Sequence, residues 1–152
     1  MPEKLEAARC GGNGGAADVL APAVIVRGLA DAVRVLAAAG GRPVLVLAPP
    51  EAARLLGPSW WVALARAARA EAGAGAAARF VLDCGAEAGI AQEALSVGAE
   101  GIVFTGTAAQ AARLASVAGK AGALLLAGAP PALDMGAPGA PRRLAAWLGR
   151  AA

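Results

Sequence analysis

The sequence contains no histidine, no tyrosine and only two cysteines. Histidine is the commonest neutral metal ligand in proteins, and the two thiols, Cys10 and Cys84, lie far apart in unrelated surroundings. These gaps predict that the chain holds no metal ion and needs no cofactor. Two isolated cysteines also cannot form the disulfide framework that stabilises small secreted domains.

Charged residues are scarce as well, at 16% against the roughly 25% usual for soluble domains. The net charge is +3, but the arginines are scattered singly, with Arg142-Arg143 as the one doublet. Nucleic-acid binders cluster their basic residues and interleave them with aromatic ones, which make up only 3% of this chain. Nucleic acid is therefore not an expected partner.

Apolar residues make up 58% of the sequence, yet charged residues interrupt every long apolar stretch. No run of about 18 uncharged apolar residues, the length that would cross a bilayer, is present. The first nine residues are charged and lack the apolar core of a secretion signal. The sequence thus favours a cytoplasmic protein with no membrane partner.

The length of 152 residues fits one domain. We expect a flexible, glycine-rich segment over 1–20 and a single α/β domain over 21–152. Within that domain, 128–140 is rich in proline and glycine and predicts a loop, and 141–150 predicts a closing helix. Short apolar runs predict five strands: Ala23–Val26, Val44–Ala48, Phe80–Leu82, Ile102–Phe104 and Ala123–Ala127.

Helical spacing between these runs predicts five βα steps. In the long helix that starts at Ser59, a candidate N-cap, the arginines Arg66 and Arg69 are expected to face solvent. Uninterrupted apolar strands indicate a parallel sheet that is buried on both faces. We therefore predict an open five-stranded parallel sheet with helices on both faces and the flavodoxin-like order 2-1-3-4-5. Half of a (βα)8 barrel is the alternative.

The stretch from Arg79 to Gly106 reads as strand, helix, strand, and each strand stops abruptly at polar residues. Ligands of open α/β sheets bind at the carboxyl ends of the strands. The candidate ligand-binding residues are therefore those that follow the third, fourth and fifth strands: Asp83, Cys84, Gly85, Thr105, Gly106, Thr107 and Gly128.

Each of these groups has a structural interpretation beside the functional one. Asp83 is a candidate general base, or it holds a loop amide or caps a helix. Cys84 is a reactive thiol at a helix N-terminus, or a small buried filler. Thr105 to Thr107 bind an anion through helix amides, or form an ordinary capped turn.

The motifs AAAGGRPVLVL, RAEAG, LDCG and ALSVGAEGIVFTG resemble the first half of the class II fructose/tagatose-bisphosphate aldolase barrel. This resemblance implies a (βα) barrel ancestry and an aldolase-like lyase activity on sugar phosphates. It would make Asp83 the catalytic acid/base and place Cys84 at a zinc-ligand position. Two positions depart from the family pattern: Val81 replaces a histidine and Thr105 replaces an aspartate. A catalytic zinc normally needs three protein ligands, so aldol cleavage is not expected.

Two functions remain open. The first is a non-catalytic domain that binds a small molecule, such as a phosphorylated metabolite, at the strand ends. The second is an interaction module that forms a homodimer, since the apolar surplus and the tryptophans favour association. The expected anchors are Trp60 or Trp61, one of which should be buried, together with Trp147.

Overall fold

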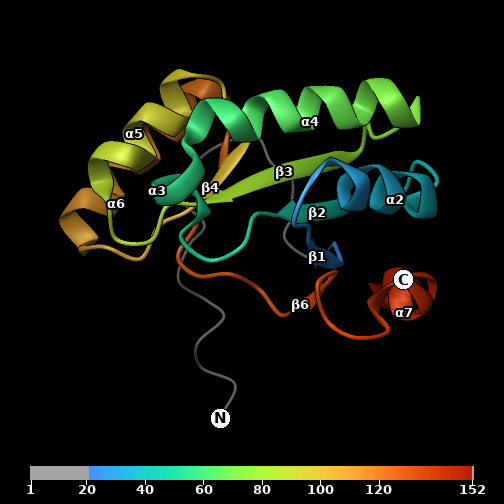
Figure 1. Cartoon of the computed structure of the whole chain (residues 1–152). Helices are drawn as coiled ribbons and strands as arrows, with labels where there is room; N and C mark the ends of the chain where they lie inside the picture. The colour runs from blue at the N-terminus through green and yellow to red at the C-terminus, as the bar shows by residue number, and fades with distance from the viewer. Residues whose placement is uncertain (1–20, 152) are drawn as a thin grey trace, which may run out of the picture.

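The computed structural model, shown in Figure 1, describes residues 21–151. The expectations for the glycine-rich segment 1–20, and for Cys10 within it, lie outside this range. Six strands are described: β1 (Ala23–Ile25), β2 (Val44–Leu47), β3 (Ala78–Asp83), β4 (Gly101–Val103), β5 (Leu124–Leu126) and β6 (Ala132–Asp134). The helices are α2 (Leu29–Ala39), α3 (Ala52–Leu56), α4 (Pro58–Ala72), α5 (Ala88–Ser96), α6 (Ala108–Ala121), α7 (Ala140–Leu148) and the 3-10 turn η1 (Gly149–Ala151).

Local sequence signals account for most helix ends. Gly40 ends α2 in the left-handed conformation, at φ 58°, which glycine adopts without strain. Thr107 begins α6 with a reciprocal capping box: its Oγ1 accepts a hydrogen bond from the Gln110 amide, and the Gln110 side chain accepts one from the Thr107 amide. The start of α4 was predicted wrongly. Gly57 is the N-cap and Pro58 opens the helix, because proline at the first position gives up an amide that has no intrahelical partner there.

All strands of the sheet run parallel, in the order β5-β4-β3-β2-β1-β6. The predicted α/β class with an open parallel sheet is confirmed, with six strands rather than five. The order differs from the flavodoxin-like 2-1-3-4-5, because the chain steps from β1 to β5 without reversing. The consecutive order of β1 to β5 is the one expected for the half-barrel alternative, and β6 extends the sheet beyond β1.

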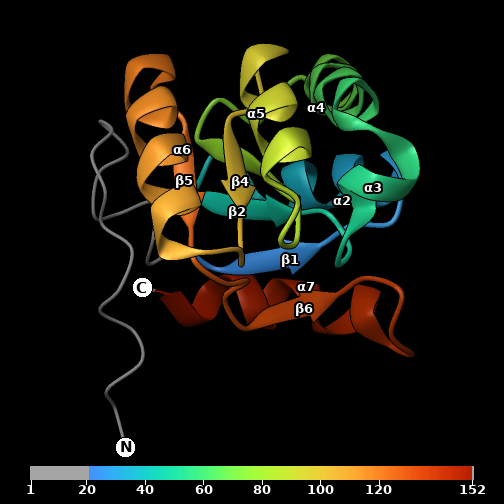
Figure 2. The ribbon, with the colours of Figure 1, turned by 90° about the vertical axis from the view of Figure 1, so that its left-hand side faces the viewer.

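This order places the helices on one face. Right-handed crossovers that all step in the same direction leave their helices on the same side of the sheet. The outer core accordingly combines strand residues with buried residues from all six α-helices, among them Leu36, Trp61, Leu95, Leu114 and Leu144. In Figure 2 the helices surround the strands, with α7 beside β6 and β1 at one end of the arc. The continuous apolar strands favoured helices on both faces of the sheet, but within 21–151 helix residues contribute to the outer core and not to the core on the other face.

The other face carries a second, inner core made by residues of the strands. Its buried members are Ala23, Leu45, Leu47, Val81, Val103, Leu124 and Leu126. Although no described helix contributes to this core, Leu45 and Leu47 are only 1% and 2% exposed. A strand-built core that buries its own members indicates a curled sheet, as inside a barrel.

The connection between the two edge strands requires the same curl. Only residues 127–131 separate the end of β5 from the start of β6. In a flat six-stranded sheet these edges would lie about 24 Å apart, at about 4.8 Å per strand. The connecting chain spans about 22 Å at most and must also return along the strand direction, since β6 is parallel to β1. The edges are therefore drawn toward each other.

The prediction of a loop over 128–140 is corrected by β6, which pairs with β1 in the register Ala23↔Ala132 and Ile25↔Asp134. A strand of three residues among prolines and glycines shows no periodicity in the sequence. Its pairing is supplied by the open edge of β1, more than 100 residues earlier in the chain. The predicted closing helix is present as α7, with Leu144 and Leu148 buried.

Candidate functional site

The carboxyl edge of the sheet brings together several of the predicted residues. Asp83 ends β3, and its Oδ1 accepts a hydrogen bond from the Gly85 amide at 2.9 Å. The Gly85 carbonyl in turn accepts one from the Thr105 amide at 2.8 Å, which joins the ends of β3 and β4. Asp83 thus holds a loop amide, one of the structural roles weighed for it. Asp83 does not cap α5, whose N-cap is Glu87.

The sequence did not indicate Glu51 as a site residue. In the structure, Glu51 is the side chain that a Cβ added at Gly85 would meet first. A Cβ placed on Gly85 would lie 3.4 Å from Glu51 Oε1. Glu51 has φ 56°, and no other non-glycine residue within 21–151 has a positive φ. A left-handed conformation is strained for a residue with a side chain and costs of order 1 kcal/mol. This strained residue follows the carboxyl end of β2. It therefore adds to the reasons for considering the carboxyl edge of the sheet a candidate functional site.

Close packing around residue 106 leaves no room for a side chain, so glycine is required there. A Cβ at this position would lie 2.3 Å from Phe104 Cζ and 2.8 Å from the Gln110 side-chain oxygen. Thr107 is exposed and forms the capping box, so the ordinary capped turn is observed here. Gly128, after β5, is exposed with open space around it and takes no part in the contacts around Gly85.

An ion pair, also not foreseen, joins the ends of β1 and β6. Arg27 donates to Asp134 through two nitrogens, at 2.6 Å and 3.1 Å. These hydrogen bonds lower the pKa of Asp134, with a smaller contribution from the Gly136 amide. Neither side chain carries a sequence pattern that would reveal the pair, because β6 itself was not predicted.

Cys84 is buried, 3% exposed, and its Sγ lies 3.8 Å from the Leu82 carbonyl. Burial, with a smaller contribution from the charge of Asp83, raises the pKa of the thiol to about 12. A protonated, enclosed thiol is a poor nucleophile and a poor metal ligand. This geometry favours the filler role for Cys84.

We expect native Cys84 to resist alkylation. With a pKa of about 12, only about one thiol in ten thousand is ionised at pH 8, and the side chain is enclosed as well. In a Cys10→Ser background, iodoacetamide at pH 8 should leave the native mass unchanged for hours and modify the unfolded chain within minutes. Equal rates for the folded and unfolded protein would show that Cys84 is a reactive thiol.

Within the described residues, no group of three or more histidine, cysteine or acidic side chains is arranged to hold a metal ion. Among the helices in that range, none has the length and apolar character needed to cross a bilayer. Comparisons of the chain with protein-family models, curated proteins and solved structures found no match.

Proposed function

We propose that this chain is a non-catalytic domain that binds a small hydroxylated phosphate compound at the carboxyl edge of its sheet. The observation that carries the proposal is the strained Glu51 beside Gly85. Strain persists in a fold only where surrounding structure enforces it, and it concentrates at functional sites. A free, buried thiol at Cys84 accords with the cytoplasm as the compartment.

The groups at this edge match both halves of such a ligand. The carboxylates of Glu51 and Asp83 would accept hydrogen bonds from sugar hydroxyls. Beyond Gly106, the first turn of α6 offers the amides of Ala108 and Ala109, because the capping box uses only those of Thr107 and Gln110. Amides at the start of a helix favour a phosphate group.

The test is thermal stabilisation across a panel of hexose and triose phosphates, with the parent sugars and inorganic phosphate as separate arms. A ligand present at about 100 times its dissociation constant should add about 2.7 kcal/mol to the free energy of unfolding. Glu51→Gly relieves the strain, so it should stabilise the free protein by up to about 1 kcal/mol and reduce the ligand-induced shift. No shift with any compound, or the same shift in Glu51→Gly, would contradict the proposal.

A second candidate, self-association into a homodimer, is favoured by the exposed leucines of α3. Leu55 is 81% and Leu56 53% exposed. The tryptophans are less suited as anchors than the sequence indicated. Trp61 lies in the core, Trp60 is half-buried, and the indole of Trp147 donates to the Ala23 carbonyl at 2.8 Å.

Light scattering on a sizing column tests this candidate. We expect a dimer mass at micromolar concentration that shifts to a monomer in Leu55→Asp, because α3 would present its leucines to a second copy. Arg54→Gln, at the neighbouring exposed position on the same helix, lowers the net charge by the same one unit and controls for the change in charge. A monomer mass for the wild-type protein would eliminate the candidate.

An ancestral relation to the aldolase half barrel also stays a proposal. The consecutive order of β1 to β5 supports it. Lyase activity is the least favoured function, because Val81 faces the inner core where the family pattern has a histidine, and the Cys84 thiol is buried.

A further inference from the structure

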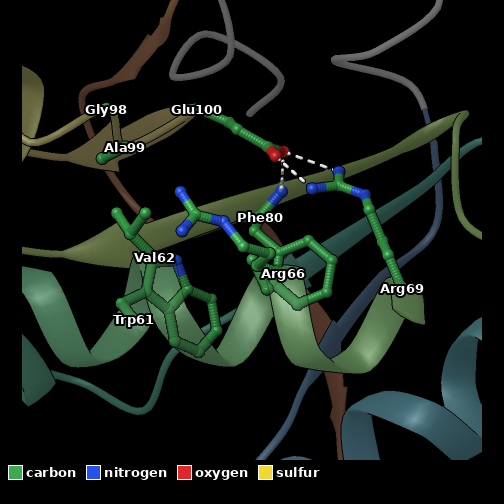
Figure 3. A pocket seen from close by; sticks show the side chains of 9 residues that line it. Trp61, Val62, Arg66, Arg69, Phe80, Gly98, Ala99 and Glu100 are labelled. Carbon is green, nitrogen blue, oxygen red and sulfur yellow. Dashed lines mark hydrogen bonds and ion pairs between the residues drawn. The ribbon is translucent and has the colours of Figure 1, made fainter. Parts of the chain in front are cut away.

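A pocket of about 240 Å³ (Figure 3) lies beside Phe80 of β3 and the amino end of β4, and none of its lining residues belongs to the carboxyl edge. It opens between α4 and the turn that leads from α5 into β4. Its walls combine apolar groups with two arginines and one glutamate: Trp61, Val62, Ala65, Arg66, Arg69, Phe80, Gly98, Ala99 and Glu100. The volume equals that of about eight water molecules, so it suits a compact ligand of about ten non-hydrogen atoms.

The pocket contains a buried hydrogen-bond donor with no acceptor. Trp61 is 1% exposed, and its Nε1 has no hydrogen-bond partner among the residues described. Trp147, by contrast, donates its indole hydrogen to the Ala23 carbonyl. Buried N–H groups without an acceptor are rare in folded proteins. In Figure 3 the indole nitrogen of Trp61 points toward the part of the pocket below Gly98 and Ala99.

Arg66 supplies an uncompensated positive charge to the same space. Its guanidinium extends over the pocket (Figure 3) and makes no hydrogen bond or ion pair with any other described residue. Arg69, one turn later, is fully engaged: it pairs with both carboxylate oxygens of Glu100 and donates to the carbonyls of Gly75 and Ala78. Since Arg69 and Glu100 neutralise each other, the pocket keeps the single charge of Arg66.

We propose that this pocket binds a small organic anion, a carboxylate on an apolar body. The carboxylate accepts hydrogen bonds from Trp61 Nε1 and from the guanidinium of Arg66. A guanidinium is planar and can present two parallel N–H donors to a carboxylate. The apolar body packs against Val62, against the aliphatic part of the Arg66 side chain and against the turn at Gly98. The site is independent of the carboxyl edge and goes beyond the function proposed there.

The experiment follows the indole N–H resonances of the ¹⁵N-labelled full-length chain during a titration with benzoate. Three tryptophans give three indole signals, and Trp147, whose indole donates to the Ala23 carbonyl outside the pocket, is the internal reference. We expect the Trp61 signal alone to move downfield, the direction for an N–H that gains a hydrogen bond. Trp61→Phe assigns the signal. If that variant unfolds, Trp60→Phe and Trp147→Phe assign it by elimination.

Two further arms separate the parts of the ligand. Benzamide keeps the apolar ring without the charge, and inorganic phosphate has the charge without the ring. Each should bind at least about tenfold more weakly than benzoate, since the pocket offers both a cation and an apolar wall. Equal binding of benzamide, or phosphate binding as tightly as benzoate, would overturn the proposal.

Variants test the assigned residue. Arg66→Ala should weaken benzoate at least about tenfold and Arg66→Lys by less, because lysine keeps the charge but loses the fork of donors. Arg113→Ala removes an exposed arginine on α6 outside the pocket and should change nothing. No movement of the Trp61 signal, or unchanged affinity in Arg66→Ala, refutes this site. Glu51→Gly should leave benzoate binding intact, so this site and the carboxyl-edge site can fail separately.

Discussion

Leu47→Ala should lower the free energy of unfolding by about 2–5 kcal/mol, the range for removing a fully buried leucine side chain. Leu47 is 2% exposed and belongs to the inner core, to which, among the described residues, only strand residues and the flanking Ala21 contribute. If the sheet were flat, this face would have no helix over it and the loss would be small. Urea denaturation gives the value, with an unchanged slope showing that the unfolded state is comparable.

The matched control is Leu55→Ala, the same chemical change at a leucine that is 81% exposed. At a concentration where the protein is monomeric, this change should alter the free energy of unfolding by no more than about 0.5 kcal/mol. Similar losses for the two variants would mean that the strand-built core contributes little and that the curled sheet is not what stabilises the domain.

How much of this fold the sequence predicts depends on the range of each interaction. The capped turn at Thr107 is a local signal, and it was one of the two interpretations given for Thr105 to Thr107 because Thr107 and Gln110 lie three positions apart. The apolar strands from β1 to β5 were predicted for the same reason. Strand order and β6 were not, since pairing between residues as distant as Ala23 and Ala132 is set by the fold as a whole.

The candidate sites follow the same division. Asp83 and Thr105 meet at one edge as predicted, because parallel strands align their carboxyl ends. The strain at Glu51 was not foreseen, because no residue pattern reports a backbone angle. Arg69 was expected to face solvent from its helical position, yet it reaches Glu100, 31 residues away in the sequence. A helical wheel assigns a face but does not show which neighbour covers it.

Breaking the pair between Arg69 and Glu100 should cost about 2–3 kcal/mol of stability. Arg69 donates to both oxygens of Glu100, and Glu100 Oε2 also accepts the Phe80 amide at 3.0 Å (Figure 3). The pair therefore joins α4 to the start of β3 and to the residue before β4. The side chains are 29% and 27% exposed, so the loss should fall below the roughly 3–5 kcal/mol of a fully buried pair.

A double-mutant cycle isolates the pair from the packing of its side chains. Arg69→Met keeps much of the side-chain volume and removes the charge, and Glu100→Gln keeps an oxygen for the Phe80 amide. Because each single variant leaves a partly buried charge unpaired, the double variant should lose about 1–2 kcal/mol less than the sum of the singles. Glu100→Ala should cost more than Glu100→Gln, since it also leaves the Phe80 amide without its acceptor.

Arg66→Met is the internal control, since Arg66 lies on the same helix one turn earlier, is exposed and has no partner among the described residues. Its effect should stay within about 0.5 kcal/mol. Raising the salt from 0.15 M to 1 M should weaken the Arg69–Glu100 coupling only in part, because screening acts less on charges that are shielded from solvent. If Arg69→Met behaves like Arg66→Met, or if the single losses add, the pair contributes no more than an ordinary surface contact. The position of α4 over β3 would then depend on apolar packing, in which Trp61, Leu64 and Ala68 of α4 take part.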